Sequence, residues 1–220
     1  MEFNLVQTIA IYALPVIFAI TLHEAAHGYV ARHFGDSSAW MLGRVSLNPL
    51  RHIDMVGTIL VPLLILVTSK LFGSGGILFG WAKPVPVNFN ALRNPKRDML
   101  WVAVAGPAAN LVMALGWALV LKLALAMPPN AFALPLSLMG EAGVNVNVVL
   151  MVLNLLPILP LDGGRVAMSL LPNKLAYRYS RLEPYGFPIL LLLIFTNVLG
   201  VIMSPMVQAS IDLIETLFQL

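Results

Sequence analysis

The residues His23, Glu24 and His27 form a His-Glu-x-x-His motif inside a long apolar segment. In a helix the two imidazoles lie ~6 Å apart along the axis on one face, so both can bind one Zn²⁺. Glu24 can then act as the general base toward zinc-activated water. Ionisable side chains inside a membrane helix are costly and usually functional. The motif therefore predicts a metalloprotease site within the bilayer; the milder interpretation is a polar helix end that only reaches interfacial water.

A catalytic zinc site needs a third protein ligand, and His33 is the first candidate. It lies ten residues after His23, the spacing of the third histidine in the metzincin motif, but Val30 stands where that motif requires a glycine. If the helix continues, His33 lies ~15 Å further along the axis and ~80° away from the ligand face. Beside Arg32, it is better interpreted as a cationic helix end at the membrane interface.

Asp162 is the second candidate ligand. It follows an apolar run interrupted by Pro157 and Pro160, and it precedes Gly163-Gly164. The prolines break the helical hydrogen bonding, and the glycines allow a tight turn. An irregular backbone at membrane depth is tolerated only where it lines protein or a wet cavity. The alternative is an ordinary helix stop with Asp162 as a turn residue.

These motifs together resemble the site-2 protease family of intramembrane zinc metalloproteases, peptidase family M50. The resemblance covers roughly 20–185. It is carried by His23-Glu24-x-x-His27, by Gly106-Pro107-Ala108-Ala109-Asn110, and by Asn154-x-x-Pro157-x-x-Pro160-Leu161-Asp162-Gly163-Gly164. The chain is similar to the short form of the family, which lacks a periplasmic PDZ insertion and a cytoplasmic CBS module.

The resemblance implies a role for five side chains. His23, His27 and Asp162 would be the ligands of one Zn²⁺ per chain, and Glu24 would be the general base. Asn154 would lie near the scissile peptide and steady the oxyanion. A milder role for an amide in a membrane helix is a hydrogen bond to a neighbouring helix. We favour the catalytic role for Asn154 and the packing role for Asn110.

The composition identifies the class of protein that must position these residues. Of 220 residues, 59% are hydrophobic and 10% are charged, against about 25% charged residues in a soluble domain. This balance is typical of a polytopic membrane protein, and one domain, 1–220, uses the whole length. Without cysteine there are no thiolate ligands, so zinc must be held by histidine and carboxylate. The net charge of +3 without a long basic run gives no nucleic-acid surface.

The expected fold is an all-α membrane protein with four to six transmembrane helices. A membrane span needs about 20 apolar residues. The four clear spans are about 5–33, 98–127, 142–160 and 188–203, the last broken by Ser204-Pro205. The segment 53–81 is either a re-entrant hairpin, which we favour, or two short spans.

The distribution of basic residues gives the expected topology. Lys and Arg flank 53–81 on both sides and follow the third span, whereas the 128–141 connection and the termini lack them. Because basic loops lie on the cytoplasmic side, both chain ends should lie outside and the site near the cytoplasmic face of a prokaryotic inner membrane. No cleavable signal is evident, since Glu2 replaces a basic start. The alternating stretch 82–90 could pair with 40–47 as a small β-hairpin near the site and bind an unwound substrate.

The expected function is an intramembrane zinc endopeptidase. Its partners would be single-span membrane proteins or signal-peptide segments within the lipid bilayer. The alternative is a non-proteolytic membrane protein that binds or transports zinc with the same ligands. Transport would need polar residues on both sides of the metal. The outer halves of the spans are apolar apart from Lys122, and a carrier has no use for Glu24 between two histidines.

Overall fold

A computed structural model describes residues 4–60, 83–128 and 130–220. Within these ranges the secondary structure is helical, and no strand is formed. The helices are α1 (Leu5–His33), α2 (Ser38–Met41), η1 (Pro49–Arg51), η2 (Met55–Leu60), η3 (Phe89–Ala91), α4 (Pro95–Ala126), α5 (Ala133–Leu155), α6 (Asp162–Leu170), α7 (Asn173–Ser180), α8 (Glu183–Phe195) and α9 (Val198–Phe218).

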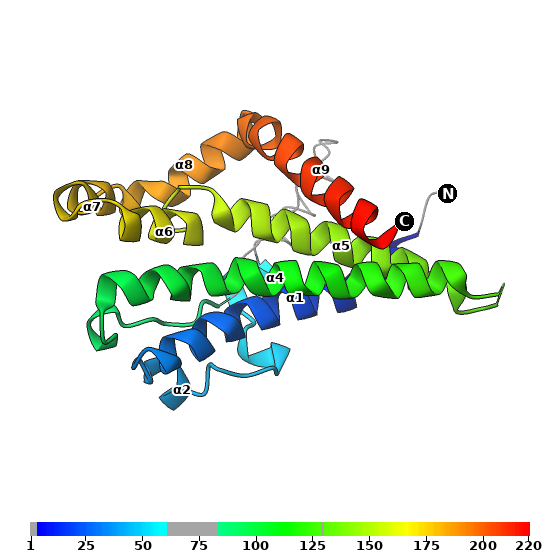
Figure 1. Cartoon of the computed structure of the whole chain (residues 1–220), viewed down its shortest axis with the longest axis horizontal. Coiled ribbons are helices and arrows are strands. Elements are labelled where there is room, and N and C mark those ends of the chain that lie inside the picture. The colour runs from blue at the N-terminus through cyan, green and yellow to red at the C-terminus, as the bar shows by residue number, and fades with distance from the viewer. Residues whose placement is uncertain (1–3, 61–82, 129) are drawn as a thin grey trace.

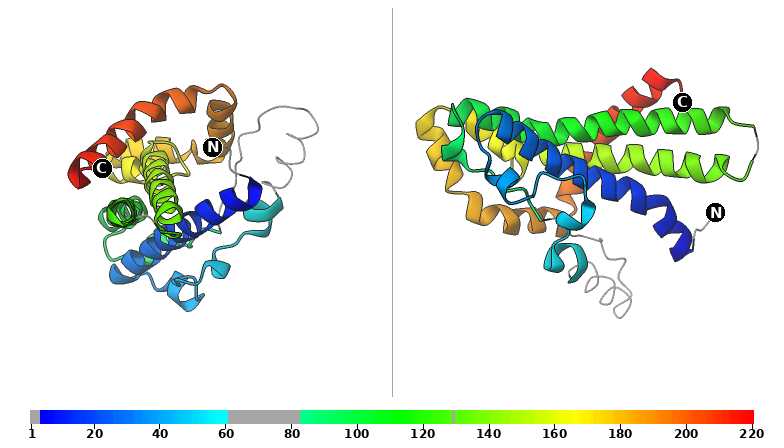
Figure 2. Two further views of the ribbon diagram at one scale, coloured as in Figure 1. Left: turned by 90° about the vertical axis from the view of Figure 1, so that its right-hand side faces the viewer. Right: turned by 90° about the horizontal axis from the view of Figure 1, so that it is seen from below.

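Four of these helices, α1, α4, α5 and α9, are long and apolar enough to cross a membrane. Helices α4 and α5 form a long antiparallel hairpin that runs the length of the molecule (Figure 1). Helix α1 packs across both of them, and the short helices α6 and α7 lie near one end of the hairpin (Figures 1 and 2). The prediction of an all-α protein with four clear spans is therefore confirmed at this level.

The ends of the site-bearing helices follow from local sequence. Asn4 caps α1 by accepting from the N–H of Gln7, whose side chain in turn accepts from the N–H of Asn4. Gly35, with φ +111°, turns the chain just after α1 ends. Helix α5 ends at Leu155 because the residue before a proline is driven out of the α conformation. The third span is thus shorter at its end than the predicted 142–160, and it begins earlier, at Ala133.

The fourth predicted span, 188–203, is wrong in its boundaries. The break falls at Asn197, which separates α8 from α9, and not at Ser204-Pro205, which lies inside α9. Asn197 adopts φ +58°, a left-handed conformation that asparagine tolerates better than most residues. Pro205 removes one backbone donor, which membrane helices accommodate. The apolar helix long enough to span is therefore Val198–Phe218.

The predicted β-hairpin between 40–47 and 82–90 does not form in the residues that the structure describes. Residues 40–41 belong to α2, and 83–88 is an extended segment without a strand partner. The hairpin does not form because most of the backbone N–H groups of 83–88 are either missing or already bonded elsewhere. Pro84 and Pro86 have no N–H, whereas Val85 and Asn88 donate theirs to carboxylates on or just after α1. Of the predicted re-entrant segment 53–81, residues 61–81 lie outside the described ranges.

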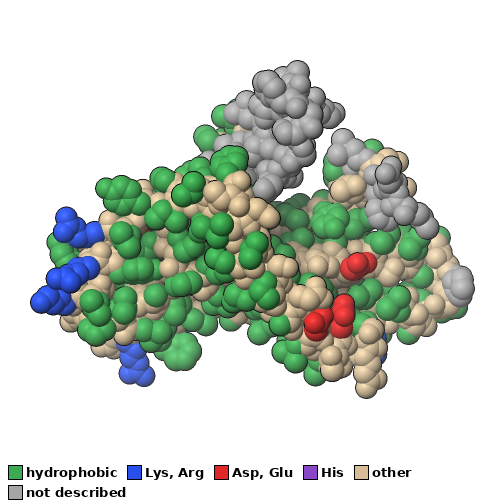
Figure 3. Space-filling view, turned by 90° about the horizontal axis from the view of Figure 1, so that it is seen from above, with side chains coloured by type: hydrophobic (Ala, Val, Ile, Leu, Met, Phe, Trp, Pro, Cys, Tyr) green, Lys and Arg blue, Asp and Glu red, His purple; other side chains and the backbone are tan. Residues whose placement is uncertain are grey.

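Charge is segregated along the molecule. Lys and Arg side chains gather at the end where α6 and α7 lie, and hydrophobic side chains are spread over the rest of the face seen in Figure 3. Lys96 ties α4 to this end, because its ammonium donates to the carbonyl of Leu171 at 2.5 Å and to Asn173 Oδ1 at 3.0 Å. The first turn of α4 and the α6–α7 connection are thereby held at the basic end.

Candidate metal centre

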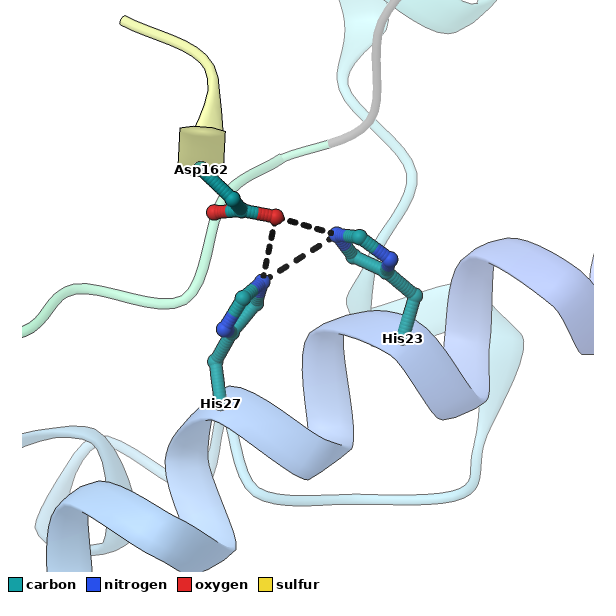
Figure 4. A group of neighbouring side chains, drawn as sticks. All are labelled: His23, His27 and Asp162. Carbon is teal, nitrogen blue, oxygen red and sulfur yellow. Dashed lines mark hydrogen bonds and ion pairs between the residues drawn. The ribbon is translucent and has the colours of Figure 1, made fainter. Parts of the chain in front are cut away.

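The two histidines of the motif lie one turn apart on α1 and point in the same direction (Figure 4). Each residue is 8% exposed, and their Nε2 atoms are 3.1 Å apart. This placement follows from the four-residue spacing in an uninterrupted helix. The sequence prediction that both rings face one point is confirmed.

Asp162 meets them from the first residue of α6. Its Oδ2 atom lies 3.2 Å from Nε2 of His23 and 3.2 Å from Nε2 of His27. The close packing around it depends on Gly164, since an added Cβ would lie 2.6 Å from the backbone nitrogen of Leu159. A Cβ on Gly163 would collide with the carbonyls of Leu155 and Leu156. The chain turns after the prolines, but Gly163 and Gly164 lie in the first turn of α6, so they are needed for close packing and not for the tight turn expected of them.

Hydrogen bonds at the far side of each imidazole fix its tautomer. His23 Nδ1 lies 2.6 Å from Oδ1 of Asn110, and His27 Nδ1 lies 2.7 Å from the carbonyl of Val102. Both partners are acceptors, so each Nδ1 carries the proton and each Nε2 presents a lone pair. The two Nε2 atoms therefore face the carboxylate of Asp162 as acceptors.

This donor set fits a bound cation. Three lone-pair atoms converge, and Oδ2 of Asp162 is buried without a hydrogen-bond donor. Such an arrangement is repulsive unless a positive charge lies among the three atoms. Two imidazoles and one carboxylate, with further coordination positions left open, are the protein ligands of many catalytic zinc sites.

The sequence favours a helix-packing role for Asn110, and the structure shows that its side chain does more than that. Its Oδ1 accepts from His23, and its Nδ2 donates to Oδ1 of Asn147 at 3.0 Å and to the carbonyl of Ala19 at 3.3 Å. Asn110 and Asn147 are both fully buried. The amide of Asn110 thus orients a histidine ring and links α1, α4 and α5 at the same depth.

Asn147 is a residue that the sequence analysis missed. Its Nδ2 donates to the carbonyl of Gly143 one turn earlier, which leaves Oδ1 to receive Asn110. A signal was present, because Asn147 lies seven residues before Asn154 and therefore almost on the same helix face. Which of the amides on α5 meets Asn110 depends on how α4 and α5 are aligned, and that alignment is not encoded locally.

Gly106 provides the space for the two imidazoles. A Cβ at this position would lie 2.6 Å from His23 Nε2 and would overlap His27 Nε2. The glycine stands on α4 against the Nε2 atoms of both histidines. Only a residue without a side chain lets α4 approach α1 this closely.

Glu24 is half-buried and lies between the histidines in sequence. Its Oε2 accepts a 2.7 Å hydrogen bond from the backbone N–H of Val85, in the extended segment 83–88. Val85 also packs near Gly28 on the same helix. A residue 61 positions away in sequence thus fixes one oxygen of the expected base, a contact that sequence reasoning did not find.

Asn154 makes no hydrogen bond to His23, His27 or Asp162 among the described residues. It is half-buried on α5, and its Nδ2 donates to the carbonyl of Leu150 on its own helix at 3.0 Å. His33 lies exposed in the last turn of α1, with its ring against Phe34 at a centroid distance of 5.1 Å. Its predicted place at the helix end is correct, and it does not join the three converging side chains.

Comparison with known proteins gives two relatives. The chain is 38% identical over 208 residues to a Bacillus subtilis (strain 168) protein named "Putative zinc metalloprotease YwhC". The aligned region covers 93% of this chain and 89% of that protein. It is 30% identical over 184 residues to "Putative zinc metalloprotease Rip2" of Mycolicibacterium smegmatis (strain ATCC 700084 / mc(2)155), covering 84% of this chain and 66% of that protein. No family model and no solved structure matches the chain.

Proposed function

The chain belongs to the family of bacterial zinc metalloproteases that includes these two relatives, in keeping with the site-2 protease resemblance of its motifs, and we propose that it cleaves peptide bonds within the membrane. Zinc is the metal of this family. The observation that carries the proposal is the convergence of His23, His27 and Asp162 from two distant helices onto one buried point. These three side chains would hold Zn²⁺.

Bound Zn²⁺ supplies a Lewis acid that polarises a peptide carbonyl and makes water a better nucleophile at neutral pH. The chain's own contribution begins with the ligands. The carbonyl of Val102 and the amide oxygen of Asn110 hold the rings in the tautomer that presents Nε2. Such partners usually change metal affinity 10- to 100-fold when they are removed.

Glu24 is the proposed general base and general acid. The N–H of Val85 occupies Oε2, and no described residue donates a hydrogen bond to Oε1. Oε1 is therefore the atom that takes a proton during attack and returns it to the leaving nitrogen. The backbone contact at Oε2 fixes the carboxylate's orientation without neutralising it.

Asn154 is proposed to contact the oxygen of the scissile carbonyl. For this role its Nδ2 must turn away from the carbonyl of Leu150, which it now meets. An amide donor aimed at a developing oxyanion typically contributes 10²- to 10³-fold to the rate. Asn154→Ala should then lower kcat while substrate binding stays close to that of the wild type.

The proposed substrates are single-span membrane proteins and signal-peptide segments. A peptide bond in a helix is shielded by its own hydrogen bonds, so the substrate must unwind locally near the site. Glu24 lies nine residues before the end of α1, ~14 Å along its axis. Helix α1 runs toward the end of the molecule where α6 and α7 lie (Figure 1), and Lys and Arg side chains gather at that end (Figure 3). This supports a site toward the cytoplasmic face of a prokaryotic inner membrane.

Glu24→Gln tests the proposal directly. The variant should keep one zinc per chain, measured by elemental mass spectrometry, and cleave a single-span test substrate about 10²- to 10⁴-fold more slowly. Glutamine keeps an acceptor for the N–H of Val85 but cannot take a proton. Glu141→Gln, at an exposed position on α5, is the matched control and should retain full activity.

Three outcomes would count against it. Unchanged cleavage by Glu24→Gln would refute the base assignment, and loss of zinc would make Glu24 a ligand. Wild-type protein that moves zinc across vesicle membranes but cleaves no membrane substrate would replace proteolysis by transport.

A further inference from the structure

A polar hollow of about 280 Å³ lies outside the metal centre, in the connection that follows α2. Three of its lining residues are cations, Arg44, Arg51 and Lys83. Within the described residues, no ion pair joins Arg44, Arg51 or Lys83 to a carboxylate.

The two guanidinium groups are held in place by backbone carbonyls. Arg44 Nη1 donates to the carbonyl of Arg51 at 2.7 Å, and Arg51 Nη1 donates to the carbonyl of Gly43 at 2.6 Å. Each carbonyl takes one of the five N–H donors of a guanidinium. The remaining donors keep their hydrogen-bonding capacity in a fixed orientation, which reduces the entropy lost when a ligand binds.

The backbone around the hollow is built for this arrangement. Gly43 has φ +63°, and a Cβ there would lie 2.6 Å from Arg51 Nη1. His52 is buried, with Nε2 2.8 Å from the carbonyl of Ser46, and its own carbonyl accepts from the N–H of Lys83 at 2.8 Å. His52 thus fixes both the loop and Lys83, which reaches the hollow from a distant part of the sequence.

Apolar side chains stand beside the cations. Leu42, Leu50 and Ile53 also line the hollow, and Leu50 is 71% exposed. Clustered cations next to exposed leucines in a membrane protein match the head and acyl chain of an anionic phospholipid. Arginine recognises phosphate oxygens through paired donors, and no carboxylate is among the described residues that line the hollow.

We propose that this hollow binds a phosphate group through Arg44, Arg51 and Lys83, most favourably the headgroup phosphate of an anionic phospholipid. The site is distinct from the metal centre and is connected to it along the chain. Lys83 is two residues before Val85, whose N–H holds Glu24. A phosphate on Lys83 therefore anchors the start of the segment that orients the base.

The test uses the full chain in detergent, titrated with dioleoyl phosphatidylglycerol, dioleoyl phosphatidylcholine or inorganic phosphate and followed by native mass spectrometry. The variant carries Arg44→Gln, Arg51→Gln and Lys83→Gln together. At about fivefold per cation, its affinity for phosphatidylglycerol should fall about 100-fold. The control carries Lys174→Gln, Arg178→Gln and Arg181→Gln on and just after α7, and its affinity should change less than twofold.

The outcomes separate the two sources of phosphate. A preference for phosphatidylglycerol over phosphatidylcholine, lost in the variant, supports the lipid site. Binding of inorganic phosphate without a lipid preference, lost in the same variant, assigns the hollow to free phosphate. Equal binding of each probe by wild type and variant overturns the proposal.

Because Arg44 and Arg51 also support the loop, the triple variant could lose binding by misfolding. The single variant Lys83→Gln separates loss of binding from loss of structure. The ammonium of Lys83 has no partner among the described residues, and its backbone bond to His52 remains. This single variant should keep the unfolding temperature of the wild type and bind phosphatidylglycerol about fivefold more weakly. An unchanged affinity in a folded Lys83→Gln protein would also overturn the proposal.

Discussion

The helices around the candidate metal centre and the C-terminal helix α9 are held to the molecule in different ways. Around the site, buried amides, imidazoles and backbone carbonyls tie α1, α4 and α5 together. On α9, the side chains of Gln208, Ser210 and Thr216 bond within their own helix. In the most apolar stretch of α5, 39% of residues are buried, against 6% in α9.

The contact between α9 and the rest of the molecule is mainly apolar. Lys122 joins the end of α9 to α4 by donating to the carbonyl of Phe218 at 2.5 Å. A hollow of about 330 Å³, lined largely by apolar side chains such as Leu199 and Met203, lies between α9 and α5. Apolar contacts within a membrane keep two helices close but do not fix how they are aligned, whereas buried hydrogen bonds between helices fix that alignment. Precise alignment is therefore concentrated where the three proposed ligands meet.

The largest expected contrast is between two aspartates. Asp162→Ala should abolish both zinc binding and cleavage, since it removes the one proposed ligand that does not come from α1. Asp212→Ala, on α9, should leave zinc content near one per chain. Zinc per chain in purified protein is the measurement. If Asp162→Ala kept its full zinc content, the carboxylate of Asp162 would not be a metal ligand.

A comparison within α4 tests how closely the helices must approach. Gly106→Ala places a methyl group against the imidazoles of His23 and His27, so α4 has to move away and zinc affinity should fall at least tenfold. Gly116→Ala meets no atom within 4 Å of its Cβ. By helix propensity alone it should be neutral or stabilise by up to about 1 kcal/mol. Similar zinc affinities in a chelator competition would show that the fit at Gly106 is not required.

The polar tie itself is tested by Asn110→Leu. Loss of the acceptor at His23 Nδ1 and of the link to Asn147 should weaken zinc binding 10- to 100-fold. Asn110→Asp keeps an acceptor for the imidazole and should recover much of that affinity. Asn145→Leu is the matched control, because Asn145 bonds to the carbonyl of Glu141 on its own helix. Equal losses in Asn110→Leu and Asn145→Leu would contradict a positioning role.

The same contrast explains what sequence could predict. The spacing within α1 is a local signal, and it predicted that the two histidines converge. The prolines and glycines around Asp162 marked it as a candidate, and the family resemblance identified it as the third converging side chain. Asn147 was missed because its partner is set by the alignment of α4 with α5. The break at Asn197 was misplaced because proline at 205 is a strong signal, whereas a left-handed asparagine leaves only a weak one.

The segment 83–88 shows a second limit of prediction from sequence. Its alternating pattern suggested a strand, but pattern alone does not reveal which acceptors its N–H groups will meet. Val85 and Asn88 find the carboxylates of Glu24 and Asp36 in place of a second strand. Carboxylates accept stronger hydrogen bonds than a neutral backbone, so this arrangement prevails over sheet pairing.

Asp36 gives the smallest effect and a dependence on pH. It lies outside the spans and accepts from the N–H of Ser38 at 2.9 Å and of Asn88 at 2.6 Å. Burial alone would raise its pKa, but the hydrogen bonds from Ser38 and Asn88 outweigh burial and lower the pKa. The folded carboxylate is thus favoured above its unfolded pKa of about 3.9, and that stability is lost as pH falls through the lower folded value.

Asp36→Asn should therefore loosen the attachment of the 83–88 segment by about 1–2 kcal/mol at neutral pH. Hydrogen exchange at the Asn88 amide measures this, and in the wild type its protection should decrease on acidification below about pH 4, whereas in the variant it should change little. Asp212→Asn, whose partner Gln208 lies on the same helix, should leave the exchange of Asn88 unchanged. If both substitutions altered that exchange equally, the segment would not depend on the carboxylate at the end of α1. A selective effect would show that one more buried polar contact, and not apolar packing, holds the part of the chain that contacts Glu24.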